Sequence, residues 1–290
     1  MKTKVIEIED LENLSPVFKG KMGNRLARFV MRLFAIDKVN GVYESSCNCT
    51  GAAFADSLLN DLGVNYLIGN AERLQHLPEG AFITVSNHPY GGLDGIMLID
   101  LMAGIRPDYK FMVNKLLSLI EAMDENFISV KPRGNKKEFD ASNINGIRET
   151  LTRLQEGHPI GFFPSGAVSD FSLKNMRVRD REWQESIVKL IHLAKVPIVP
   201  IRFFDINSPL FYILGLINWR VRVIRMPYEI FNKQKQQPRI GIGKIITVEE
   251  QAKCKDIRAL GAFLRKTVYE MPIPTSFVTG SNLKSTLKAL

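Results

Sequence analysis

Residues 82–103 read FITVSNHPYGGLDGIMLIDLMA, and the pattern changes halfway along this stretch. Its first five residues, Phe82 to Ser86, form a short apolar and β-branched run that predicts a buried strand. From Leu93 to Ala103 the apolar residues favour a helix. Between the two lie a proline and a pair of glycines, which are typical of tight turns. A strand followed by a turn and a helix is the unit from which parallel sheets with crossover helices are built.

The same alternation continues after Pro78 and predicts an α/β fold, with a mainly parallel sheet flanked by helices. We assign residues 76–290 to this α/β domain. Its further strands are predicted at Lys110 to Val113, Phe127 to Val130, Ile160 to Phe163, Ile198 to Phe203, Val221 to Arg225 and Arg239 to Ile242. Its further helices are predicted at Ile144 to Leu154, Glu182 to Ala194 and Glu249 to Tyr269.

Residues 1–75 are predicted to form an N-terminal helical appendage that contacts a membrane. Between residues 21 and 36, apolar side chains recur at spacings of three and four, and arginines fall on the opposite face. An apolar face opposed by arginines is typical of a helix that lies in the headgroup region of an anionic membrane. The same pattern also fits a helix docked on the protein's own core. The longest apolar run, residues 209–219, is about half of the ~20 residues that a spanning helix needs, so we predict peripheral attachment.

The composition limits the classes of partner that we expect for this protein. The 290 residues include 39 Lys and Arg against 30 Asp and Glu, a formal net charge of +9. Such a charge favours an anionic partner, which can be a nucleic acid, an acidic protein or a membrane surface. Three cysteines are too few for a disulfide framework or a four-cysteine zinc site, so we predict a reducing compartment and no metal.

His88 and Asp94 are the candidate catalytic pair. They lie between the first predicted strand and its helix, and ligands gather at the carboxyl ends of parallel strands. Gly91 and Gly92 permit a tight turn that returns Asp94 to His88. A carboxylate bonded to one ring nitrogen leaves the other free to accept a proton from a hydroxyl. The alternative is that Asp94 only favours the first turn of the helix and His88 is an ordinary loop residue.

Several motifs together resemble a known family. Asn87-His88 followed by Asp94 is similar to the first motif of the glycerolipid acyltransferases of the bacterial lysophosphatidate acyltransferase type. Five residues separate His88 from Asp94, where four are usual, and this form resembles the hemolysin-like branch, which includes O-acyltransferases that make ornithine and glycine lipids. Further motifs follow in the family's order at Phe127 to Arg133, Phe163 to Gly166 and Val196 to Pro200, and Asp205 to Phe211 resembles a marker of that branch.

The resemblance implies an acyltransferase fold and a reaction. His88 and Asp94 would form the catalytic dyad, and Lys131 or Arg133 would bind the anionic head of the acceptor. The residues implied in substrate binding are Asn87, Gly91, Gly92, Lys131, Arg133, Pro164, Ser165 and Gly166. A fatty acyl group would pass from an acyl carrier protein or coenzyme A thioester to the hydroxyl of a lyso-lipid, with no cofactor, at the cytoplasmic face of the inner membrane. A glycine or ornithine lyso-lipid is the expected acceptor, and lysophosphatidate is the alternative.

Ser165 departs from the family pattern. The third motif usually carries Glu at this position, and here no acidic residue follows until Asp170. A hydroxyl both donates and accepts hydrogen bonds, which suits a neutral or zwitterionic acceptor. The other interpretation is that Ser165 only shapes the turn.

The expected chemistry is direct attack by the lipid hydroxyl, with His88 as general base. Backbone amides at Gly91 and Gly92, or at Ser165 and Gly166, are candidates for stabilising the oxyanion. Arg177, Arg179 and Arg181 are candidates for a basic rim that meets an acidic carrier protein or a coenzyme A phosphate, or else they are a solvated charge run. Two other classes remain: a lipid-binding protein without catalysis, and a nucleic-acid-binding protein. The latter leaves His88 and Asp94 unexplained, and we predict no nucleic-acid partner.

Overall fold

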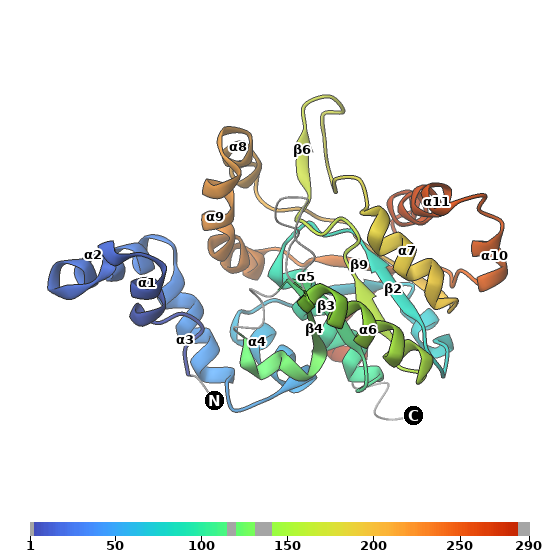
Figure 1. Cartoon of the computed structure of the whole chain (residues 1–290), viewed down its shortest axis with the longest axis horizontal. Coiled ribbons are helices and arrows are strands. Elements are labelled where there is room, and N and C mark those ends of the chain that lie inside the picture. The colour runs from blue at the N-terminus through green and yellow to red at the C-terminus, as the bar shows by residue number, and fades with distance from the viewer. Residues whose placement is uncertain (1–2, 115–119, 131–140, 284–290) are drawn as a thin grey trace.

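The computed structural model describes residues 3–114, 120–130 and 141–283 (Figure 1). Its centre is an eight-stranded sheet in the order β10-β1-β9-β8-β2-β5-β3-β4. Five neighbouring strands, from β8 to β4, run parallel to one another, and the predicted α/β fold is confirmed. The strands are β1 Leu67–Gly69, β2 Ile83–Ser86, β3 Lys110–Asn114, β4 Phe127–Val130, β5 Ile160–Phe162, β8 Ile198–Phe203, β9 Arg239–Ile242 and β10 Phe277–Thr279.

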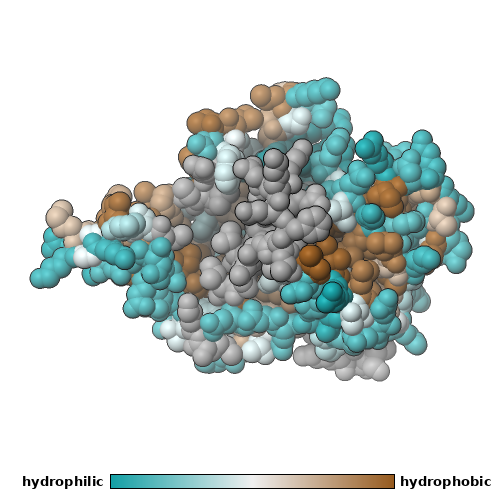
Figure 2. All heavy atoms as spheres, in the orientation of Figure 1, coloured by the Kyte–Doolittle hydropathy of each residue, from teal (hydrophilic) through white to brown (hydrophobic). Residues whose placement is uncertain are grey.

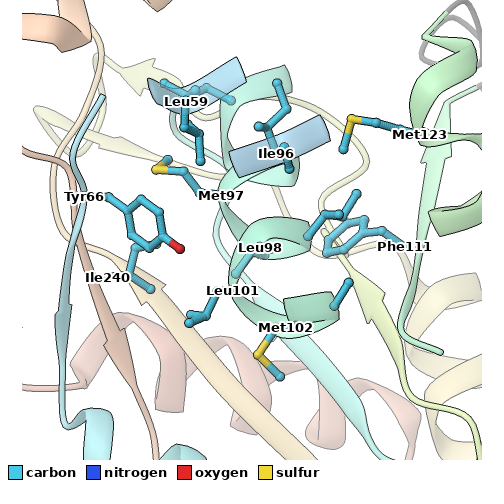
Figure 3. Close-up of a cluster of buried hydrophobic side chains, with 14 of the residues drawn as sticks. Leu59, Tyr66, Ile96, Met97, Leu98, Leu101, Met102, Phe111, Met123 and Ile240 are labelled. Carbon is cyan, nitrogen blue, oxygen red and sulfur yellow. The ribbon is translucent and has the colours of Figure 1, made fainter. Parts of the chain in front are cut away.

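Both faces of this sheet are covered, because its strands alternate apolar side chains between two cores. On β8, Val199 and Ile201 pack into one cluster, whereas Ile198 packs into the other. The first cluster lies under α4 (Gly51–Asp61) and α5 (Gly92–Leu98), which continues as a π-helical turn, Ile99–Ala103; Figure 3 shows part of it. The second lies under α6 Ala141–Gln155, α7 Glu185–Ala194 and α11 Ile257–Glu270; the short α10 spans Val248–Ala252.

The N-terminal region is helical, as predicted, and extends to one side of the sheet (Figure 1). It comprises α1 Ile8–Leu14, α2 Gly20–Leu33, α3 Ile36–Ser46 and α4. The division at residue 75 stays a prediction; β1, at Leu67–Gly69, already belongs to the sheet. Short 3₁₀ turns occur at Pro16–Phe18, Ala71–His76, Glu121–Asn126 and Lys233–Lys235. In the part of the chain that the structure describes, no helix is long and apolar enough to span a bilayer.

One predicted strand is wrong. Val221 to Arg225 lies inside a helix, α9 (Trp219–Asn232), which pairs with α8 (Pro209–Ile217). The alternating valines and arginines favoured a strand locally, but charged contacts at helical spacing form instead. The Glu229 carboxylate lies 3.7 Å from Arg225 and 3.8 Å from Lys233, four residues to either side. These local pairs, together with the packing of α9 against α8, override the β-propensity of this segment.

A small hairpin stands apart from the main sheet. It consists of β6 (Asp170–Ser172) and β7 (Arg177–Arg179), and it rises beside α8 at the upper edge of Figure 1. It follows the carboxyl end of β5 in the chain, so it borders the edge of the sheet where β2 ends. The predicted catalytic turn lies at that same edge.

Candidate active site

The turn between β2 and α5 brings His88 and Asp94 together. The Nδ1 atom of His88 lies 2.8 Å from the Oδ2 atom of Asp94, and the same oxygen accepts the backbone N–H groups of Tyr90 (2.9 Å) and Gly91 (3.0 Å). Gly91 has φ +85°, a conformation that favours glycine, and a Cβ there would lie 2.6 Å from the sulfur of Met226. The sequence therefore folds locally so that Asp94 faces back to His88.

The environment of the pair sets its electrostatics. The Asp94 carboxyl is fully buried, and this burial raises its pKa, while the hydrogen bond from His88 and those from the two amides act in the opposite direction. The His88 side chain is 16% exposed. Since Nδ1 is engaged by the carboxylate, Nε2 is the ring nitrogen that can accept a proton.

Neighbouring groups hold the imidazole in place. Its ring stacks on Phe163, with the centroids 3.9 Å apart and the planes at 19°. The Asp180 carboxylate accepts the backbone N–H of His88 (3.1 Å) and the Ser169 hydroxyl (2.6 Å), and the Ser169 N–H donates to the His88 carbonyl (2.8 Å). Asp180 is 92 residues away from His88 in the sequence. It lies in a run of charged residues, and no motif or spacing marks it as part of the site.

Asn87 is tied to the sheet. Its side-chain amide donates to the Phe203 carbonyl (2.9 Å), and its side-chain oxygen accepts the Phe203 N–H (2.8 Å). Both groups are buried, so Asn87 fixes the end of β2 against the end of β8. In this geometry its side chain supports the turn, whereas a contact with substrate would require both bonds to open.

We expect Asn87→Ala to lower the free energy of unfolding by about 2 kcal/mol or more, because it leaves the buried N–H and C=O of Phe203 unpaired. Chemical denaturation monitored by circular dichroism measures this loss. Asn65→Ala, at an exposed asparagine, is the matched control and should be nearly neutral. Equal stability of the two variants would contradict this structural role.

The third motif forms a turn beside the pair. The Ser165 hydroxyl donates to the Ala167 carbonyl (2.8 Å), and the residue is only 5% exposed. Pro164 accepts the Gln184 N–H through its carbonyl (2.8 Å), and Gly166 adopts φ +64° with Gln184 packed where a Cβ would lie. Of the two interpretations of Ser165, the geometry supports the one in which it shapes the turn.

A cavity of about 110 Å³ opens beside His88. Phe163 and the three glycines Gly91, Gly92 and Gly166 border it near the imidazole. Its remaining walls are almost entirely apolar: Gly95, Ile96, Met112, Val113, Ile120, Met123 and Phe127. A base at the edge of an apolar cavity is suited to a hydroxyl that reacts with a group on a hydrocarbon chain.

Two of the suggested oxyanion amides already donate within the turns. The Gly91 N–H bonds to Asp94, and the Gly166 N–H donates to the Phe163 carbonyl (2.9 Å). Either would have to give up a bond to serve an oxyanion. The other two suggested donors are the amides of Gly92 and Ser165, which lie in the same two turns.

The predicted basic residues divide into two groups. Lys131 and Arg133 lie outside the described residues. In the run after the third motif, Arg181 pairs with Asp170 (2.7 Å), Arg179 lies over the Tyr269 ring (4.9 Å) and Arg177 is exposed. Two of these three arginines therefore have partners within the chain, and their role as a basic rim stays a prediction.

Comparison with known proteins adds independent findings. The model of a family described as acyltransferase matches residues 11–274. A lyso-glycine lipid O-acyltransferase of Bacteroides thetaiotaomicron is 24% identical over 252 residues, which cover 84% of this chain and 88% of that protein. A protein of the same name from Phocaeicola vulgatus is 24% identical over 275 residues, with 90% and 94% covered. The crystal structure of a 1-acyl-sn-glycerophosphate acyltransferase from Thermotoga maritima is similar with a TM-score of 0.47 and 13% identity, covering 92% of this chain and 90% of that one.

Proposed function

This chain belongs to the acyltransferase family whose model it matches over residues 11–274, and on that premise we propose that it acylates the hydroxyl of a lyso-glycine lipid with His88 as general base. The observation that carries the proposal is the 2.8 Å bond between His88 and the buried Asp94 at the edge of an apolar cavity. The names of the two bacterial relatives support the acceptor.

This geometry supports the following reaction. Nε2 of His88 takes the proton of the lipid hydroxyl while the oxygen attacks the carbonyl carbon of a fatty acyl thioester. Asp94 stabilises the imidazolium that forms, because its carboxylate already faces Nδ1. The tetrahedral oxyanion then collapses, the carbon–sulfur bond breaks, and the imidazolium returns the proton to the thiolate. The products are an ester and a free thiol, and the donor is an acyl carrier protein or coenzyme A thioester.

The apolar cavity is the proposed place for the start of the acyl chain. At about 110 Å³ it is smaller than the roughly 300–1,000 Å³ of typical ligand pockets, so it would hold only the part of the chain next to the carbonyl. Gly95 lines this cavity from α5, and the nearest atom that a Cβ there would meet is in the Phe163 ring, 4.0 Å away. A larger side chain at this position therefore projects into the space.

We expect Gly95→Leu to lower kcat/KM for long-chain thioesters about tenfold or more, because four added carbons occupy much of the cavity. Initial rates with donors of increasing chain length measure the effect. Gly104→Leu, at an exposed glycine farther along the same helical segment, is the control and should keep the wild-type profile. An unchanged chain-length profile in Gly95→Leu would show that the acyl chain does not bind in this cavity.

The reaction is proposed to occur at the cytoplasmic face of the inner membrane. The side chains of Met22, Leu26, Phe29 and Leu33 on α2 are exposed, as a helix lying in the interface requires. Three arginines lie on the same helix, Arg25, Arg28 and Arg32, and anionic headgroups suit them.

A panel of acceptors tests the proposed substrate. Labelled acyl carrier protein and acyl coenzyme A are each supplied with lyso-glycine lipid, lyso-ornithine lipid and lysophosphatidate in mixed micelles. The proposal predicts an ester product with the highest kcat/KM for lyso-glycine lipid. Preference for lysophosphatidate would move the chain to glycerophospholipid synthesis, and no product with any acceptor would favour a lipid-binding protein without catalysis.

A further inference from the structure

The hairpin of α8 and α9 exposes an apolar surface that the reaction itself does not use. Leu210, Ile213, Leu216, Ile217, Trp219 and Val221 are all exposed, and Figure 2 shows hydrophobic residues gathered over α8 at the upper edge of the molecule. From residue 206 to residue 228 the sequence contains no Asp or Glu. Of its arginines, Arg222 is buried against Asp170, and Arg225 lies 3.7 Å from the buried Glu229 carboxylate. An apolar surface without acidic residues is unusual for a solvated helix pair.

The tip of the β6–β7 hairpin also exposes apolar side chains and contains no acidic residue. Leu173 and Met176 are 66% and 70% exposed, although the tip is a turn between two short strands. Lys174 and Arg177 lie beside them, and residues 171–179 contain no acidic side chain. Apolar side chains interspersed with cations are typical of segments that enter the interface of an anionic bilayer.

Hydrogen bonds and an ion pair connect these two surfaces with each other and with the candidate active site. The guanidinium of Arg222, on α9, is buried; it pairs with Asp170 of β6 and donates to the Ser169 carbonyl (3.3 Å). The N–H of Ser169 donates to His88. In the other direction, the Tyr228 hydroxyl of α9 donates to the Leu33 carbonyl at the end of α2 (2.7 Å). A continuous set of contacts thus connects α9 and the β6–β7 hairpin with the backbone of His88 and with α2.

We propose that α8 and the β6–β7 tip form a second membrane-docking surface, whose occupant is the headgroup and upper acyl region of an anionic bilayer. The surface rests on the proposed function, because it would hold the opening beside His88 at the leaflet from which a single-chain lipid enters. The exposed cations of the tip, Lys174 and Arg177, complement anionic headgroups, and Trp219, at the start of α9, is of the residue type enriched at membrane interfaces. Both protrusions rise from the same edge of the molecule in Figure 1.

The double variant Ile213→Glu/Ile217→Glu tests the docking. We expect it to bind phosphatidylglycerol-containing vesicles about tenfold or more weakly in flotation, because two carboxylates replace apolar groups in the interface. Ile273→Glu is the matched control, since Ile273 is 57% exposed and Ile213 is 53% exposed, and it should bind as the wild type does. Full vesicle binding by the double variant would overturn the proposal.

Two further readouts separate this proposal from the proposed function. Acyl transfer to an acceptor dispersed in detergent should be unchanged in the double variant, since neither isoleucine lines the cavity. If instead vesicle binding is kept and the KM for acyl carrier protein rises, the surface belongs to that acidic partner and the bilayer assignment is overturned. Failure of the wild type to transfer acyl groups would count against the proposed function alone.

Tryptophan fluorescence reports the docking depth directly. The chain has two tryptophans, of which Trp183 is buried and Trp219 is exposed on the hairpin. On addition of vesicles the emission should shift to shorter wavelength and be quenched by brominated lipids, and both changes should vanish in Trp219→Phe. Vesicle-bound wild-type protein with unchanged emission would place the hairpin outside the membrane.

Discussion

Replacing His88 with alanine is expected to lower kcat for acyl transfer by about 10²–10⁴-fold, because the variant loses the proposed general base, which would take the proton of the hydroxyl during attack. Among the described residues that line the cavity, His88 is the one whose side chain carries a basic nitrogen. KM for the donor should change little, since the apolar walls of the cavity remain. Initial rates at saturating donor and acceptor measure the effect.

The chain offers a matched control for this variant. His158 lies 2.8 Å from Asp108 through its own Nδ1, so its contact with a carboxylate is as short as that of His88. It precedes β5, whereas His88 follows β2, and the two parallel strands therefore place the two pairs at opposite edges of the sheet. We expect His158→Ala to keep the wild-type kcat. Equal losses in both variants would indicate a general effect on folding.

Asp94→Asn is expected to lower kcat about 10²–10⁴-fold without unfolding the turn, because it removes charge and not shape. The amide oxygen of asparagine can still accept the N–H groups of Tyr90 and Gly91, so the local fold is kept. What is lost is the negative charge that stabilises the imidazolium and holds its tautomer. Rates measured with the same donor and acceptor as for His88→Ala give the comparison.

Measuring the stability of Asp94→Asn shows whether its loss of activity comes from impaired catalysis or from unfolding. Burial disfavours the charge of Asp94, as the raised pKa of its carboxyl indicates, so a neutral side chain of the same shape removes an electrostatic cost. We therefore expect a denaturation midpoint close to that of the wild type at pH 7. Asp94→Ala, which leaves the amides of Tyr90 and Gly91 without their acceptor, should be less stable. Full activity of Asp94→Asn would contradict the role of Asp94 in the pair.

The parts of the site that could be predicted from the sequence are formed by residues that lie close together in the chain. His88 and Asp94 are six residues apart, and the proline and glycines between them fix the turn that joins them. The strands β2, β3, β4, β5, β8 and β9 were also predicted, because each is a short buried run whose apolar residues need no distant partner to be identified. The carboxyl-edge location of the turn follows from the parallel sheet.

The remaining parts depend on contacts between distant segments. Asn87 binds Phe203 at a separation of 116 residues, and Asp180 binds His88 at 92, so neither partnership leaves a pattern in the sequence. The three-residue strands β1 and β10 are too short for a periodicity to show. Residues 221–225 favoured a strand by propensity, yet they form part of α9, which packs against α8.

The most direct test of the account follows the acyl group itself. Wild type and His88→Ala are each incubated with a radiolabelled acyl thioester and lyso-glycine lipid, and the products are separated and treated with mild base. The account predicts a labelled, base-labile ester on the lipid hydroxyl, formed by the wild type and reduced about 10²-fold or more in the variant. Equal ester formation by both proteins, or none by folded, vesicle-bound wild type, would contradict it.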